Sequence, residues 1–121
     1  MRKILLVEEH PAFQQFMGAF LSNYFEVVAA RNTMEAMAWI QKGFMPDFIV
    51  AEADTSEGGT DGLLQMLQCT GMYAHIPVVL LGKKEHLTDA DQYKLMGAAN
   101  YFTKPFNPVF LKNYLLQQAT A

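Results

Sequence analysis

The chain has 121 residues, of which 51% are hydrophobic, and its 12 acidic and 9 basic side chains give a net charge of −3. This length and apolar content fit one domain, 1–121, with a buried core, and they exclude intrinsic disorder. The excess of acidic side chains argues against a nucleic-acid-binding face. The single cysteine, Cys69, excludes a disulfide framework. No apolar run approaches the roughly 18 residues of a membrane span, so we expect a cytoplasmic protein.

Short apolar runs alternate along the chain with segments of helical periodicity. The first run, 4–7, is apolar throughout, as expected for a strand buried on both faces. Pro11 then begins a helix whose apolar residues recur at spacings of three and four. In chain order, strands are predicted at 4–7, 25–29, 48–51, 78–81 and 100–103. Helices are predicted at about 11–24, 33–42, from Asp61 onward, 87–96 and 108–118.

This alternation predicts an α/β protein with a doubly wound, five-stranded parallel sheet between two layers of helices. Ligands of such sheets bind beyond the carboxyl ends of the strands. Charged residues follow four of these predicted ends, namely Glu8 and Glu9, Glu52 and Asp54, Lys83 and Lys84, and Lys104. We therefore expect these side chains to meet at one edge of the sheet.

Carboxylates that gather at one edge repel each other unless a hard cation or an ammonium group neutralises them. Mg²⁺ prefers oxygen ligands and often bridges to a phosphate, and a lysine can bind a phosphoryl oxygen as a point charge. The pattern therefore indicates magnesium-assisted phosphoryl transfer to a carboxylate. An acidic surface neutralised by lysines and water is the alternative. A flavin site is disfavoured, because the segment 8–11 offers no glycine-rich loop for a phosphate.

Two further features have ordinary structural explanations. His10 lies beside the acidic pair, but no second ligand follows at a metal-binding spacing, so we expect a loop residue before a helix. Lys83 and Lys84 follow the fourth predicted strand and are expected to be solvated loop lysines.

Five stretches of the sequence carry a resemblance to a known family. They are Ile4–Glu9, Pro46–Val50, Asp61–Leu63, Ile76–Leu81 and Gly97–Phe106. Together they resemble the receiver domains of bacterial two-component response regulators, over essentially the whole chain. The resemblance implies a flavodoxin-like (βα)5 fold and a role in phosphorelay signalling. It implies no enzymatic turnover beyond self-phosphotransfer and autodephosphorylation.

The resemblance also implies roles for individual residues. In the family, an acidic pair holds Mg²⁺ together with the acidic residue that ends the third strand, and Glu8, Glu9 and Glu52 occupy these places. A lysine binds the phosphoryl group, and an aromatic residue three positions earlier changes rotamer on activation. Lys104 and Tyr101 match these last two roles.

Two departures from the family pattern concern the metal and the switch. Glu9 stands where the family has Asp, and the longer side chain is expected to weaken Mg²⁺ binding, because Mg²⁺ requires near-ideal octahedral geometry. Gly82 stands where the family has Ser or Thr. The chain therefore has no hydroxyl at residue 82 to contact a phosphoryl group or to couple with Tyr101.

A third departure concerns the phosphoacceptor, for which two positions are open. Counting forward from Pro46-Asp47 past the four strand residues 48–51 leads to Glu52, whereas counting back seven residues from Asp61-Gly62 leads to Asp54. We favour Glu52, because a buried strand tolerates a change of register poorly and a surface loop absorbs an insertion easily. Asp54 is then expected in the loop.

These departures predict an atypical receiver, or pseudo-receiver, in which Glu52 pairs with Lys104 and the domain acts as a phosphorylation-independent interaction module. The alternative is a receiver that accepts a phosphoryl group from a histidine kinase on Asp54 with Mg²⁺. The expected partners are proteins: a histidine kinase, a phosphotransfer protein or an output protein. In the family the face formed by helix four, strand five and helix five binds partners or forms a homodimer. Here that face would carry Tyr93, Tyr101, Phe106 and Phe110.

Overall fold

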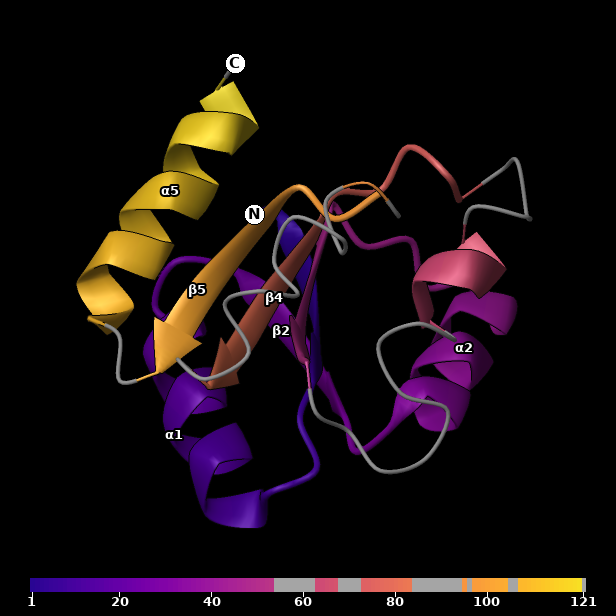
Figure 1. The fold of residues 1–121 in the computed structure, drawn as a ribbon, viewed down its shortest axis with the longest axis horizontal. Coiled ribbons are helices and arrows are strands. Elements are labelled where there is room, and N and C mark those ends of the chain that lie inside the picture. The colour runs from indigo at the N-terminus through magenta and orange to yellow at the C-terminus, as the bar shows by residue number, and fades with distance from the viewer. Residues whose placement is uncertain (54–62, 68–72, 84–94, 96, 105–106, 121) are drawn as a thin grey trace.

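Five parallel strands form the centre of the molecule in the computed structural model (Figure 1). The structure describes residues 1–53, 63–67, 73–83, 95, 97–104 and 107–120. The strands are β1 (Lys3–Val7), β2 (Glu26–Ala30), β3 (Phe48–Glu52), β4 (Val78–Lys83) and β5 (Asn100–Lys104). Their order in the sheet is β2-β1-β3-β4-β5, so the chain winds first to one side of β1 and then to the other.

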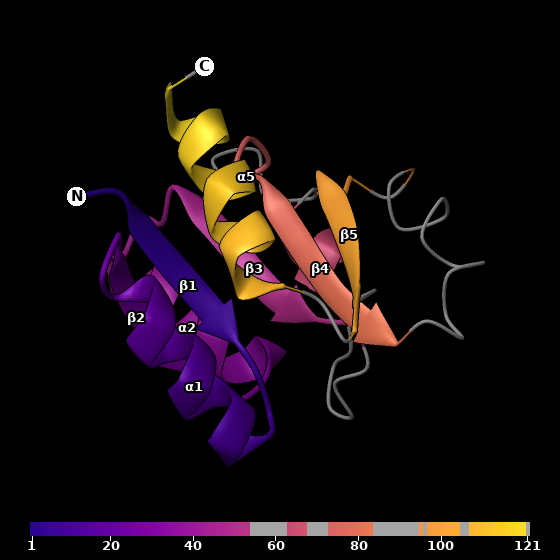
Figure 2. The ribbon, with the colours of Figure 1, turned by 90° about the vertical axis from the view of Figure 1, so that its left-hand side faces the viewer.

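Helices cover both faces of this sheet, which gives the three layers that the sequence predicted. One face is covered by α1 (Pro11–Leu21) and α5 (Pro108–Thr120), and the other by α2 (Thr33–Gln41) and a helical segment at 63–67 (Figures 1 and 2). The sheet order and the two helix layers confirm the predicted flavodoxin-like α/β fold. In the described part of the chain, no helix has the length and apolar character needed to cross a membrane.

Alternate residues of each strand point into two separate cores. In β1, Leu5 and Val7 face the core under α2, whereas Ile4 and Leu6 face the core under α1 and α5. This follows from the pleat, which sends successive side chains to opposite faces. Because helices cover both faces, every inner strand needs apolar residues throughout, and the short apolar runs of the sequence reflect this.

Four strands continue beyond their predicted carboxyl ends. β2, β3 and β5 each extend by one residue, to Ala30, Glu52 and Lys104, and β4 extends by two. The apolar run predicts that β4 ends at Leu81, but the strand continues through Gly82 and Lys83. These two residues pair in register with Thr103 and Lys104 of β5. Lys83 thus lies in a strand and not in a loop. Lys84, the helix expected at 87–96 and the Asp61 cap lie outside the described residues.

Candidate functional site

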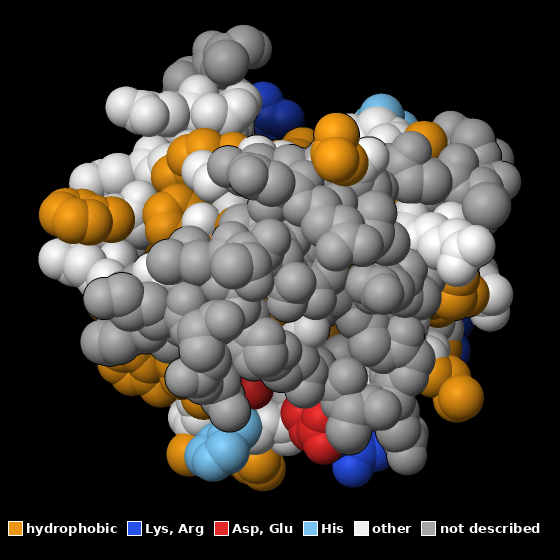
Figure 3. Space-filling view, in the orientation of Figure 1, with side chains coloured by type: hydrophobic (Ala, Val, Ile, Leu, Met, Phe, Trp, Pro, Cys, Tyr) orange, Lys and Arg blue, Asp and Glu red, His pale blue; other side chains and the backbone are white. Residues whose placement is uncertain are grey.

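The carboxyl ends of the parallel strands meet at one edge of the molecule, where the sequence placed the charged residues. The register aligns Val7 of β1 with Ala51 of β3, and Glu52 with Leu81 of β4. Glu8 and Glu9 directly follow β1 and therefore lie beside the end of β3. Acidic side chains show together at this edge in the space-filling view (Figure 3).

Glu8 is held in a fixed, buried position at this edge. Its side chain is only 3% exposed, and its Oε1 accepts a hydrogen bond of 3.0 Å from the backbone N–H of His10. Its own backbone N–H donates to the carbonyl of Ala30 at 2.9 Å. Hydrogen bonds from N–H groups offset part of the cost of burying a carboxylate. The Glu8 side chain is therefore tied to the loop that enters α1.

Gln14 joins the ends of β1 and β2, a role that the sequence analysis did not identify. Its Nε2 donates to the carbonyl of Glu8 at 3.0 Å and to the carbonyl of Ala30 at 3.2 Å. The sequence feature that could have identified Gln14 is its position three residues before the buried Met17. This spacing places a polar side chain on the inner half of α1. Gln14 thereby fixes the backbone that carries Glu8.

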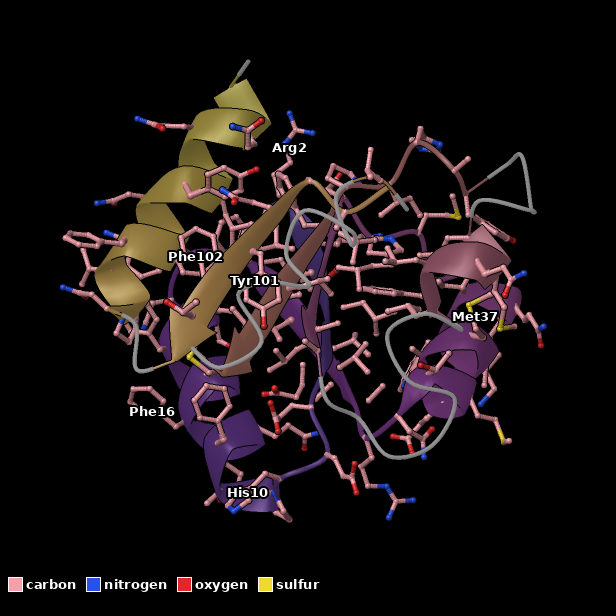
Figure 4. The ribbon with its side chains drawn as sticks, in the orientation of Figure 1. Arg2, His10, Phe16, Met37, Tyr101 and Phe102 are labelled. Carbon is pink, nitrogen blue, oxygen red and sulfur yellow. The ribbon has the colours of Figure 1, made fainter. Side chains whose placement is uncertain are left out.

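His10 precedes a helix, as the sequence analysis predicted. It is the N-cap of α1, where its Nδ1 accepts a long hydrogen bond of 3.5 Å from the N–H of Phe13, and Pro11 occupies the first turn (Figure 4). The cap satisfies an amide group that would otherwise lack an intrahelical partner.

The predicted metal ligands differ in their exposure and do not converge. Glu8 is buried, Glu52 is half-buried and Glu9 is exposed. Among the residues that the structure describes, no three His, Cys, Asp or Glu side chains are placed to hold a metal ion together. A role for Glu8, Glu9 and Glu52 in holding Mg²⁺ therefore stays a prediction.

Glu52 is the last residue of β3, one of the two positions considered for the phosphoacceptor. The strand pairing includes it, and the following N–H, of Ala53, donates to the carbonyl of Leu81 at 2.7 Å. Asp54 lies outside the described residues. Lys104 is the last residue of β5, but its side chain also lies outside the described part, so its pairing with Glu52 stays a prediction.

Tyr101 packs over Gly82, which the sequence alone did not reveal. A Cβ atom built on Gly82 would overlap the Tyr101 hydroxyl and lie 2.6 Å from Tyr101 Cζ. Tyr101 is half-buried and packs against the core under α2 (Figure 4). It therefore does not contribute an exposed aromatic ring to the expected partner face. Phe110 does, with 66% of its surface exposed, whereas Tyr93 and Phe106 lie outside the described residues.

Comparison with known proteins identifies the family. The response regulator receiver domain family matches residues 4–116. The phosphate regulon transcriptional regulatory protein PhoB of Klebsiella pneumoniae is 29% identical over 108 residues, which are 88% of this chain and 47% of that protein. Hybrid signal transduction histidine kinase D of Dictyostelium discoideum is 27% identical over 104 residues, which are 86% of this chain and 7% of that protein. The chain thus spans less than half the length of these relatives.

Solved structures agree in fold. The chemotaxis response regulator CheY4 of Vibrio cholerae has a TM-score of 0.87 at 24% identity, covering 97% of this chain and 98% of the other. The receiver domain of a DNA-binding response regulator from Colwellia psychrerythraea 34H has a TM-score of 0.90 at 20% identity, with both chains covered completely. These structures share the fold, and the match of the family model to residues 4–116 shows that the chain belongs to the response regulator receiver domain family of two-component signalling.

Proposed function

We propose that this receiver domain is a pseudo-receiver, a cytoplasmic interaction module that binds its protein partners without being phosphorylated. The observation that carries the proposal is the place of Glu52 as the last residue of β3. By the resemblance to the family, this is the position that we assign to the phosphoacceptor aspartate. A carboxylate there provides a permanent negative charge. The glutamate side chain extends about 1.5 Å further than that of aspartate, by one carbon–carbon bond.

Two neighbouring features support the proposal. Gly82, at the end of β4, provides no hydroxyl for a phosphoryl group. Glu8 is buried and Glu9 is exposed, and no three carboxylates of the described residues are grouped as Mg²⁺ ligands. Each change alone weakens phosphoryl transfer, and together they favour its loss.

The built-in charge has a natural partner in Lys104. Both residues end their strands at the same edge, and only β4 lies between β3 and β5. In this proposal the Lys104 ammonium pairs with Glu52 and fixes the edge in one state. Protein partners, such as a kinase, phosphotransfer or output domain, would then bind this state without a phosphoryl donor.

The test is exposure of the purified protein to acetyl phosphate and Mg²⁺, followed by intact mass measurement. We expect no phosphoryl adduct, whereas a phosphorylatable receiver in the same mixture gives a stoichiometric one. Asp54→Ala distinguishes the alternative: a stoichiometric adduct that disappears in this variant would show a receiver that is phosphorylated on Asp54. An adduct that persists in Asp54→Ala but disappears in Glu52→Gln would equally refute phosphorylation independence.

A further inference from the structure

Gly82 and Tyr101 lie on the same face of two paired strands. Tyr101 is aligned with Leu80 and Thr103 with Gly82, so these four positions share the face of the sheet that lies under α2. The Tyr101 ring leans along the sheet from the level of Leu80 to that of Gly82, toward the carboxyl edge (Figure 4). The phenol therefore fills the space directly over the Gly82 Cα.

The space over Gly82 is too small for any other side chain while Tyr101 remains there. A Cβ atom at residue 82 would overlap the Tyr101 hydroxyl, and it would lie 2.6 Å from Tyr101 Cζ and 3.1 Å from the Ala53 Cβ. Contacts below about 3.0 Å do not occur for real Cβ atoms, so either the ring or the strand would have to move.

The backbone gives no other reason for a glycine at this position. Among the described glycines, only Gly43 and Gly97 have a positive φ, at 105° and 112°. Gly82 thus has a backbone conformation that any residue can adopt. A glycine inside a strand is unfavourable unless another group approaches closely. Here the closely approaching group is the Tyr101 phenol.

We propose that Tyr101 supplies, from β5, the side chain that β4 lacks at residue 82. Its phenol is held inward in one orientation, and its hydroxyl stands where a residue-82 side chain would begin, next to Ala53 at the end of β3. The inward state of Tyr101 is then set by the sequence and does not wait for a chemical signal. A fixed Tyr101 ring would also explain how partners bind without phosphorylation. Only this last step rests on the proposed function.

The first test reads the orientation of Tyr101 directly. The full chain is labelled with 3-fluorotyrosine, and the fluorine resonance that disappears in Tyr101→Phe is assigned to Tyr101. In the unmodified chain we expect this resonance to be shielded from a soluble paramagnetic gadolinium chelate. In Gly82→Ala the ring is displaced, so its resonance shifts and its paramagnetic relaxation increases severalfold. A Tyr101 resonance that is exposed from the start, or unchanged by Gly82→Ala, would overturn the proposal.

A double-mutant cycle provides a second, independent measurement. We expect Gly82→Ala to lower the folding equilibrium constant about tenfold, which corresponds to about 1.4 kcal/mol. In the Tyr101→Leu background the same change should have less than a threefold effect, because the clashing ring is absent. Gly18→Ala is the matched control, since a Cβ there meets nothing within 4 Å, and it should not lower the constant. Equal effects of Gly82→Ala in both backgrounds would refute the coupling.

These results are separable from the test of the proposed function, because neither measurement uses a phosphoryl donor. A shielded Tyr101 in a protein that forms a phosphoryl adduct would uphold the Gly82–Tyr101 pair and reject the pseudo-receiver. An exposed Tyr101 in a protein that forms no adduct would reject the Gly82–Tyr101 pair and uphold the pseudo-receiver.

Discussion

Replacing Gln14 by alanine tests how the buried end of β1 is held. The Nε2 of Gln14 donates two hydrogen bonds, of 3.0 and 3.2 Å, to the carbonyls of Glu8 and Ala30. A net hydrogen bond stabilises a protein by about 1 kcal/mol, so the loss of both costs about 2 kcal/mol. Alanine is the better helix former and returns a few tenths of a kcal/mol. We expect Gln14→Ala to lower the free energy of unfolding by about 1–2 kcal/mol.

Gln15→Ala is the matched control, because Gln15 is the next residue of the same helix and is exposed. It gains the same helix propensity and loses neither of the two bonds. Urea unfolding of both variants, followed by circular dichroism, should place the Gln14→Ala midpoint about 0.7–2 M below that of Gln15→Ala, because the two variants differ by about 2 kcal/mol and small proteins have a typical slope of about 1–3 kcal/mol per M. Identical midpoints would refute the role assigned to Gln14.

Two further predictions concern the metal and a helix cap. Titration calorimetry should show Mg²⁺ affinity well below that of a receiver with an aspartate pair, because Glu8 is buried against the His10 N–H and Glu9 is exposed; tight binding would contradict this account. Asn32→Ala should cost about 1 kcal/mol of unfolding free energy, because the Asn32 Oδ1 accepts from the N–H of Glu35 at 2.8 Å as the cap of α2. Asn113→Ala, at an exposed position inside α5, should not destabilise the protein, and an equal loss in both variants would exclude a specific capping effect.

The sequence predicted the layers of the fold because a strand that is buried on both faces must consist of apolar residues. A central strand such as β3, with Phe48 through Ala51 all buried, must be apolar at every position. The same logic fails at β4, which continues past its apolar run into Gly82 and Lys83. Backbone pairing with β5, not side-chain hydrophobicity, determines where that strand ends.

The candidate site was predictable to the level of strand ends and no further. Parallel strands present their carboxyl ends at one edge, so the order of residues along the chain was enough to bring Glu8, Glu9 and Glu52 there. Whether each carboxylate is buried or exposed depends on how the surrounding chain packs around it. At Glu8 the neighbouring His10 N–H binds the carboxylate, and the side chain of Gln14 in α1 holds the backbone.

By itself, then, the sequence determined the fold class, the edge that carries the charges and the residues that depart from the family pattern. It could not give the order of the strands, because that order depends on which side each helical crossover takes. From the sequence, Gly82 was interpreted only as a position that lacks the family's hydroxyl group. Only the tertiary structure placed the Tyr101 phenol in the space that Gly82 leaves open, because the two residues are 19 positions apart in the chain and meet solely through the pairing of β4 with β5.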